Sequence, residues 1–386
     1  EDPDRRGGMM VEQRNLELAQ QLRHELHAHP ELSCQETWTR QHLIDFLREN
    51  TSNLQIVDPA AGYFYAKYDA GPGKPVLAFR ADFDAVPVEE GICLPWSSQT
   101  PGVAHKCGHD GHSATLACFA LEVDQKGAPC SIIFLFQDAE EVGVGAPIAV
   151  NALLEEQTSE VYGLHNWSDM EMDEVHLIDG PTMPASKGMT VHMVGSPSHA
   201  AQPENGINPA FAIAKIVDAI PRLIDPAGKK GYVMCTIVQV DVGSLNFGVQ
   251  ASEGSISMTL RAQYEDEIND LQHAIEQMAI DSAREQGMVV DFSFNDEFPA
   301  LINDVGCANR VREACESAGI KWNNLPSPSP VRASEDFGNY TRVIPGCFFY
   351  VGNGMGYPPV HTTEFDFRDP IIGIGTEVFK KLAGVG

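Results

Sequence analysis

The segment SIIFLFQDAEE, residues 131–141, joins an apolar run to three carboxylates. A short apolar run of this kind predicts a strand that is buried on both faces of a parallel sheet. Two adjacent acids at its end, Glu140 and Glu141, cost free energy beside a buried strand unless a cation neutralises them. We therefore interpret the segment as a strand that carries acids to a site; the simpler alternative is a solvated strand end.

Two further apolar runs end in the same way. PVLAFRAD (75–82) ends in an acid and SEVYGLHN (159–166) ends in an imidazole, and helical stretches lie between the runs. Strands that alternate with helices predict an α/β domain with a mostly parallel sheet and helices on both faces. Because ligands bind at the carboxyl edge of such sheets, the three runs are expected to meet in one crevice.

A different pattern begins near residue 187. The segments KGMTVHMVG, NPAFAIAKIVDAIPRLI, YVMCTIVQVDVG, SISMTLRAQ, EDEINDLQHAIEQMAIDSAREQG and MVVDFSFND follow one another in the order βαββαβ. This is the order of a ferredoxin-like α+β unit. We predict a first catalytic part at 9–186, an inserted lid and dimerisation domain at 187–297, and a second catalytic part at 298–386.

Composition excludes several classes of partner. The chain has 386 residues and a formal net charge of −28, which repels phosphate backbones and anionic lipid, so neither nucleic acid nor membrane is an expected partner. It shows no apolar run of the roughly 18 residues that span a membrane, and its first ten residues lack the apolar stretch of a secretory signal. Its nine cysteines form no CxxC pair. These features predict a cytoplasmic protein.

The segment HKCGHDGH, residues 105–112, is rich in side chains that bind metals. Thiolate and imidazole are good ligands for Zn²⁺ and similar ions, and we expect Cys107 and His109 to alternate along an extended segment and face one point. Asp110 and His112 stand where a helix is expected to begin. The alternative for this pair is structural, with Asp110 as a helix cap and His112 as a buried, hydrogen-bonded side chain.

Seven ordered motifs resemble one family of enzymes. The chain is similar to the metal-dependent amidohydrolases that include hippurate hydrolase, N-acyl-amino-acid amidohydrolases and auxin-conjugate hydrolases, which are relatives of aminoacylase and the glutamate carboxypeptidases. The similarity starts at RHELHAHPE (23–31) and extends to the C-terminus. The motifs are RADFDAVP, HKCGHDGH, FQDAEE, GLHN, SHAAQPENGINP, SEDF and HTTEFDF.

The resemblance implies a site with two divalent ions, taken to be Zn, Mn, Ni or Co. It implies that Glu140 is the general base and acid and that Asp82 orients a metal-binding imidazole. It also implies that His199, from the inserted domain, reaches the active site of a second copy and stabilises the oxyanion, which makes the protein a homodimer. The implied metal ligands are Cys107, His109, Glu141, His165 and His361.

Some of these residues have simpler alternatives. His199 is also explained as a turn residue and His361 as a surface histidine, although both follow loops of the kind that hold functional side chains. Asn246 and Arg261, near strand edges of the inserted domain, are candidates for binding a substrate carboxylate. Arg261 is equally explained by a pair with a surface acid.

Two positions depart from the family pattern. Asp138 stands where the family usually has proline, and this carboxylate is expected either to raise the pKa of the base or to contact a cationic substrate. LNFGV, residues 245–249, replaces the usual NVIP in the inserted domain. The second departure affects the expected substrate more than the expected reaction.

The sequence thus predicts hydrolysis of the amide bond of small N-acyl amino acids by a metal-activated water. Alternative substrates are p-aminobenzoyl-glutamate, N-acetyl-diaminopimelate and dipeptides. A serine mechanism lacks its GxSxG motif. Two other rivals are Cys107 as a nucleophile, its pKa lowered by nearby histidines, and a catalytically silent homologue that only binds metal or ligand.

Overall fold

The computed structural model describes residues 11–326, 329 and 331–386 and divides into two compact units. Unit 1 comprises Glu1–Thr182, Leu301–Pro330 and Glu335–Gly386. Unit 2 comprises Met183–Ala300 together with Val331–Ser334. The segment 331–334, which the sequence assigned to the second catalytic part, thus lies in unit 2, where Arg261 binds it through hydrogen bonds.

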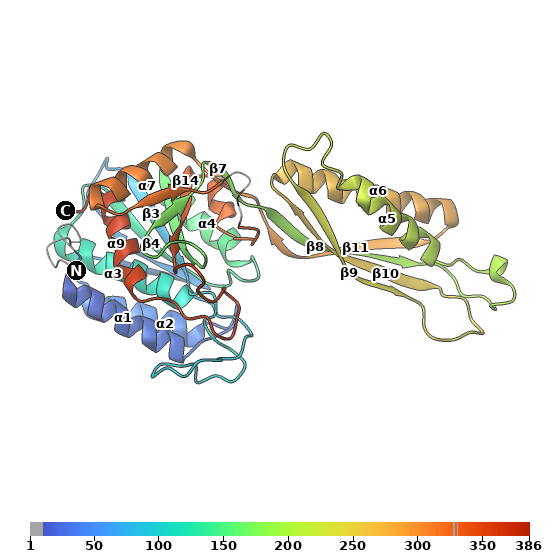
Figure 1. Cartoon of the computed structure of the whole chain (residues 1–386), viewed down its shortest axis with the longest axis horizontal. Coiled ribbons are helices and arrows are strands. Elements are labelled where there is room, and N and C mark those ends of the chain that lie inside the picture. The colour runs from blue at the N-terminus through green and yellow to red at the C-terminus, as the bar shows by residue number, and fades with distance from the viewer. Residues whose placement is uncertain (1–10, 327–328, 330) are drawn as a thin grey trace. The chain divides into compact units, whose positions relative to one another are not determined.

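Unit 1 is an α/β structure around one sheet with the strand order β1-β2-β4-β3-β5-β14-β6-β13 (Figure 1). Its strands are β1 (Gln55–Ala61), β2 (Tyr63–Tyr68), β3 (Val76–Asp82), β4 (Ser131–Gln137), β5 (Glu160–Trp167), β6 (Val175–Leu177), β13 (Trp322–Asn324) and β14 (Gly346–Gly352), and a separate pair is formed by β7 (Gly180–Met183) and β12 (Leu301–Asn303). Its helices are α1 (Gln13–Ala28), α2 (Thr37–Asn50), α3 (His109–Lys126), α4 (Gly145–Glu155), α7 (Val305–Ala318), α8 (Gly338–Thr341) and α9 (Pro370–Leu382).

The centre of this sheet is parallel. Strand β3 pairs in parallel with β4 on one side and with β5 on the other, and β5 pairs in parallel with β14. Helix α3 leads from β3 to β4 and α4 leads back from β4 to β5, so right-handed crossovers place these helices on opposite faces. All seven residues of β4 are buried, as the apolar run 131–137 predicts. The predicted fold class is confirmed here.

The strand order reverses at β3, and ligands bind at such switch points. The carboxyl ends of β3, β4 and β5 lie at this edge of the sheet and carry Asp82, the Glu140–Glu141 pair and His165. The loop that begins α3 enters the same edge with Cys107. The topology alone therefore collects residues that are far apart along the chain.

Unit 2 is a four-stranded antiparallel sheet in the order β11-β8-β10-β9, with two helices. This order and the βαββαβ sequence define the ferredoxin-like arrangement predicted from residue 187 onward. The apolar core lies between the sheet and the two helices. The elements are β8 (Ala185–Val194), η2 (Pro203–Asn205), α5 (Ala210–Leu223), β9 (Val233–Val242), β10 (Glu253–Ala262), α6 (Glu265–Gln286) and β11 (Val289–Phe298).

None of the described helices is both long enough and apolar enough to cross a membrane.

Candidate metal centre

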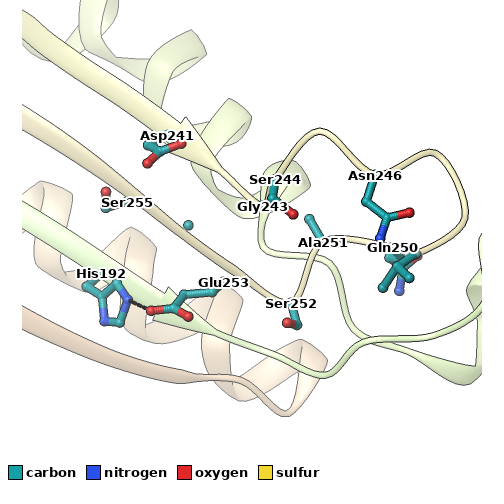
Figure 2. A pocket seen from close by; sticks show the side chains of 12 residues that line it. His192, Asp241, Gly243, Ser244, Asn246, Gln250, Ala251, Ser252, Glu253 and Ser255 are labelled. Atoms are coloured by element: carbon teal, nitrogen blue, oxygen red, sulfur yellow. Dashed lines mark hydrogen bonds and ion pairs between the residues drawn. The ribbon is translucent and has the colours of Figure 1, made fainter.

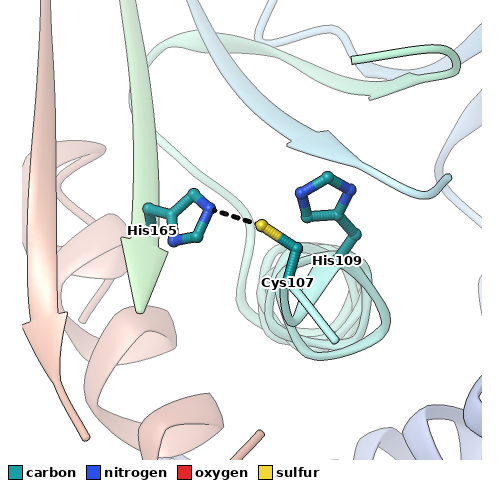
Figure 3. A group of neighbouring side chains, drawn as sticks. All are labelled: Cys107, His109 and His165. Carbon is teal, nitrogen blue, oxygen red and sulfur yellow. Dashed lines mark hydrogen bonds between the residues drawn. The ribbon is translucent and has the colours of Figure 1, made fainter. Parts of the chain in front are cut away.

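Two groups of potential metal ligands meet at Cys107. One group consists of Cys107, His109 and His165, and the other of Cys107, Glu141 and His361; within each group the ligand atoms lie within 4.8 Å of one another. Figure 3 shows the first group, with Cys107 just before the start of α3 and between the two imidazoles. The structure thus brings together all five residues that the family resemblance implied as ligands.

The distances within these groups are short. Sγ of Cys107 lies 3.4 Å from Nε2 of His165, and Nε2 of His361 lies 3.1 Å from Oε1 of Glu141. Between the two groups, Nε2 of His109 lies 3.7 Å from the same glutamate oxygen. Sulfur, nitrogen and oxygen donors at this spacing fit borderline-soft divalent ions such as Zn²⁺.

The ring nitrogens of the histidines test whether the site fits a metal. His109 uses Nδ1 for Asp84, at 3.0 Å, and its buried Nε2 has no hydrogen-bond partner within the described residues. His165 uses Nδ1 for the carbonyl of Asn166, at 2.6 Å, so that its Nε2 faces Cys107. In both residues one nitrogen is fixed by the protein and the other is left for an ion, which is the usual arrangement of metal ligands.

His112 differs from these two histidines. Its Nδ1 lies 2.6 Å from Asp82, and its Nε2 lies 2.7 Å from the side-chain oxygen of Asn166. Both ring nitrogens therefore have protein partners, and the side chain is buried. The structural alternative predicted for His112, a buried and hydrogen-bonded imidazole, is confirmed.

The ligand loop is not the extended segment that the sequence predicted. Gly108 has φ +103°, and helix α3 begins at His109. A Cβ atom at position 108 would lie 2.2 Å from the side chain of Asn166, so only glycine fits here. The left-handed turn, rather than strand alternation, directs Cys107 and His109 to one point.

Helix α1 holds the start of α3 through contacts with Asp110. Arg23 donates a 2.8 Å hydrogen bond to Asp110, and Nδ1 of His27 lies 2.8 Å from the same carboxylate. Asp110 is therefore bound to another helix, in contrast to the cap suggested by the sequence. The backbone carbonyl of Lys106 accepts a 2.6 Å hydrogen bond from the N–H of His361, which links two segments that carry ligands.

The carboxylates around His109 prepare the site for a cation. Burial alone lowers the pKa of His109, but Asp82, Asp84 and Glu141 outweigh it and raise that pKa to about 10. Burial, followed by Glu141 and Glu140, raises the pKa of the Cys107 thiol well above its usual value. Without an ion, protons must therefore neutralise this cluster, and a bound metal would displace them.

Glu140 lies beside the ligands and points toward a second set of acids. Carboxylate oxygens of Glu140, Glu335 and Asp336 lie within 4.8 Å of one another. Oε2 of Glu140 also lies 3.9 Å from Nε2 of His109. Burial, then the charges of Glu335 and Glu141, raise the pKa of Glu140 well above its usual value. Asp138 is not among these main causes, because its carboxylate packs against Gly62 instead.

Three residues of the site, Asp84, Glu335 and Asp336, were assigned no role from the sequence. Asp84, not Asp82, contacts Nδ1 of a predicted ligand, while Asp82 lies 3.8 Å from Nε2 of His109. Glu335 and Asp336 lie within SEDF, one of the seven motifs that carry the family resemblance. The buried guanidinium of Arg80 lies 2.6 Å from Asp82 and 2.7 Å from Asp336, and so balances part of the acidic charge.

The three remaining predicted residues lie in unit 2. His199 forms a β-bridge with Val249, so the SHAAQP loop lies beside the LNFGV loop that carries Asn246. Asn246 and Val249 of the LNFGV loop line a hollow of about 450 Å³, whose lining residues Figure 2 shows; His199 is not among them. Asn246 accepts a 3.1 Å hydrogen bond from the N–H of Gly248.

Arg261 lies at the opposite end of the same hairpin. The strand from Glu253 to Arg261 rises by roughly 26 Å at about 3.3 Å per residue. Arg261 donates hydrogen bonds of 3.1 Å to the carbonyl of Arg332 and 2.8 Å to the hydroxyl of Ser334, instead of pairing with a surface acid. Within one copy, the structure therefore does not bring Asn246 and Arg261 together.

Residues 78–384 match the model of Peptidase family M20/M25/M40. The chain belongs to this family. The match confirms the resemblance drawn from the seven motifs, and the named relatives confirm that the chain is of the metal-dependent amidohydrolase class. One relative is an N-acetyl-L-cysteine deacetylase of Bacillus subtilis, which is 30% identical to this chain over 86% of this chain and 79% of its own length.

Other relatives extend the similarity. An N-acetylcysteine deacetylase of B. subtilis is 27% identical over 94% of this chain and 95% of its own. The crystal structure of the B. subtilis YXEP protein, described as a dinuclear metal binding peptidase from the M20 family, superposes with a TM-score of 0.82 and 25% identity over 96% of this chain and 98% of its own. A dinuclear relative agrees with the two ligand groups that share Cys107.

Proposed function

We propose that this M20-family protein hydrolyses the amide bond of small N-acyl amino acids at a pair of divalent metal ions. The observation that carries the proposal is the position of Cys107, which belongs to both three-residue ligand groups while Glu140 lies alongside them. One donor shared by two groups suits two neighbouring ions. Glu140 belongs to neither of these two groups, although its carboxylate also lies within 4.8 Å of ligand atoms of His109 and Glu141, so it is placed next to the proposed ions.

Bound divalent ions supply a Lewis acid that lowers the pKa of water to about 7 and polarises a carbonyl oxygen. Glu140 is the proposed general base, which takes the proton from the attacking water and returns it to the leaving amine. In the metal-free chain burial and neighbouring acids raise the pKa of Glu140, and two bound cations would lower this pKa again, so that the carboxylate is ionised and can accept the proton. The mixed donor set is compatible with Zn²⁺, Mn²⁺, Co²⁺ or Ni²⁺.

His199 is the proposed donor to the oxyanion. The N–H of Ala201 donates a 3.0 Å hydrogen bond to Nδ1 of His199, so a neutral imidazole carries its proton on Nε2. His199 is an exposed residue, and an Nε2–H group has the polarity that an oxyanion requires. The proposal that it serves the active site of a second copy stays a prediction.

We also infer a homodimer that forms through unit 2. Strand β9 is an edge strand whose apolar side chains are exposed: Val238 is 68% and Val240 is 49% accessible. The adjoining loop exposes Leu245 and Phe247, each 91% accessible. A second copy that pairs with this edge would cover both features. In such a dimer, residues at opposite ends of unit 2 can serve two different active sites, which accounts for the separation of Asn246 from Arg261.

The names of the relatives indicate which substrates to test first. Besides the two deacetylases of N-acetylcysteine, they include an N-acetyldiaminopimelate deacetylase of Exiguobacterium sibiricum, 26% identical, and an IAA-amino acid hydrolase of Arabidopsis thaliana, 28% identical. A panel should add N-benzoyl amino acids, p-aminobenzoyl-glutamate and dipeptides. Amine release is measured with each metal after exhaustive chelation, and we expect activity to be lost on chelation and restored by metal.

Two rivals make different predictions in the same assay. A cysteine nucleophile would stay active after chelation; the raised pKa of Cys107 opposes this rival, because it leaves little thiolate. A silent homologue would show thermal stabilisation by metal or ligand without releasing amine from any compound. A cytoplasmic location stays a prediction.

A further inference from the structure

The turn after strand β4 carries Glu140 and Glu141 and is held by carboxylates from other parts of the chain. The N–H of Ala139 donates a 2.9 Å hydrogen bond to Glu36, and the N–H of Glu141 donates a 3.0 Å hydrogen bond to Asp84. Glu36 lies 103 positions away in sequence. The backbone that presents the two catalytic candidates is therefore fixed by distant side chains.

Ala139 has an unusual backbone conformation. It is fully buried and has φ +49°, in the left-handed region that alanine rarely adopts. The carboxylates of Glu140 and Glu141 both lie near His109, but Glu140 also lies near Glu335 and Asp336, whereas Glu141 also lies near Cys107 and His361. The left-handed residue just before them sets the direction in which the chain enters this pair. Strain of this kind persists only where the surroundings enforce it, and it is concentrated at functional sites.

Glu36 is available for this task because it does not cap its own helix. It stands at the N-terminal end of α2 and makes no side-chain capping bond. Glu31 does so instead, accepting hydrogen bonds from the N–H groups of Thr39, at 2.8 Å, and Trp38, at 3.2 Å. Glu36 is only 6% exposed, and its Oε1 atom faces the N–H of Ala139.

We propose that Glu36 is a positioning residue for the glutamate pair. By accepting the N–H of Ala139, it holds this residue in the left-handed conformation, so that Glu140 is placed for proton transfer and Glu141 for metal binding. The inference rests on the proposed hydrolysis for its kinetic part. Its metal-binding part is independent of any substrate.

The first test compares Glu36→Ala with Glu36→Gln, which keeps an oxygen acceptor of the same length. We expect Glu36→Ala to lower kcat by about 10–100-fold with KM nearly unchanged, and to weaken metal binding measured by calorimetry by a similar factor. Glu36→Gln should retain most of both properties. Equal losses in the two variants, or unchanged kcat and metal affinity in Glu36→Ala, would overturn the proposal.

Glu31→Ala is the matched control, because it removes a carboxylate from the same segment that caps α2 but does not contact the turn. It should lower the melting temperature while leaving kcat and metal affinity within about twofold of the parent protein. If Glu31→Ala lowers kcat as much as Glu36→Ala does, Glu36 has only a general structural role.

The second test restores the turn without Glu36. Glycine adopts positive φ at no steric cost, so Ala139→Gly should recover at least part of the kcat and metal affinity lost in Glu36→Ala. If the fold-change in kcat of the double variant equals the product of the fold-changes of the two single variants, Glu36 does not act through Ala139. If the parent protein with metal cleaves no N-acyl amino acid, the proposed function fails, whereas the metal affinities of the same variants still decide the role of Glu36.

Discussion

The Nδ1 nitrogen of His109 lies 3.0 Å from the Oδ1 oxygen of Asp84. This contact fixes the ring so that its Nε2, which has no hydrogen-bond partner among the described residues, faces the other candidate ligands. Asp84 also accepts the N–H of Glu141, so one carboxylate orients one predicted ligand and the backbone of another. Its chemistry resembles the carboxylate and histidine pairs that tune zinc sites.

Substitution of Asp84 tests this relationship directly. Asp84→Asn should weaken metal binding by about 10–100-fold, because the amide is a poorer acceptor for the imidazole N–H. Calorimetric titration of the metal-free protein measures the change. Ser33→Ala removes a hydroxyl that donates to the same carboxylate at 2.8 Å and serves as the control, with an expected change of about twofold or less. Metal affinity that is equal in Asp84→Asn and the parent protein would exclude the orienting role.

Removal of the proposed base should separate chemistry from metal binding. Glu140→Gln is expected to keep both ions while lowering kcat by about 10²–10⁴-fold. Elemental analysis and amine release measure the two properties. Asp138→Asn is the matched control, because this neighbouring carboxylate packs against Gly62 and should change kcat by less than about threefold. Unchanged turnover in Glu140→Gln would refute its role as base.

Substitutions of different predicted ligands should leave different numbers of metal ions bound to the chain. Cys107 belongs to both ligand groups, so Cys107→Ala should remove both ions. His361, whose side chain is 47% exposed, belongs to one group, and His361→Ala should leave one ion bound to Cys107, His109 and His165. Metal content per chain, measured after dialysis, distinguishes these outcomes. Two ions retained by Cys107→Ala would contradict the shared position of the thiolate.

Metal binding should release protons and strengthen as pH rises. The metal-free protein holds a proton on His109, whose pKa is about 10, and another on the Cys107 thiol, whose pKa is raised above its usual value. Both protons must leave when the ions bind, so the binding constant should rise by up to about 100-fold per pH unit between pH 6 and 8. Calorimetry in buffers with different ionisation enthalpies counts the protons. Uptake of protons, or a binding constant that falls with pH, would contradict this.

The inferred dimer can be disrupted at one edge of unit 2. Charges at exposed positions of β9, introduced by Val238→Glu together with Val240→Glu, should convert dimer to monomer in analytical ultracentrifugation. Val289→Glu changes an exposed residue, 65% accessible, on the opposite edge strand β11 and should leave the dimer intact. A parent protein that is monomeric at all concentrations tested, or a dimer lost only in Val289→Glu, would exclude the β9 interface.

The amino-acid sequence was sufficient to predict the main architecture, because the patterns that indicate strands and helices are local in the sequence. The apolar run 131–137 marks a strand buried on both faces through its composition, and the order βαββαβ after residue 187 follows from periodicity within each segment. The five proposed ligands came from motifs whose order along the chain is preserved in a family. Neither kind of inference required knowledge of which distant residues touch.

The contacts that refine the site depend on packing and could not be read in this way. RADFD offers two acids, and only the position of α3 against β3 pairs Asp84 with His109 and Asp82 with His112. Glu36 meets Ala139 through the docking of helix α2, and Asn246 and Arg261 are separated by the length of one strand. A hydrogen bond requires two groups to meet within about 3 Å, and for residues this far apart in sequence it is the folded chain that sets their distance.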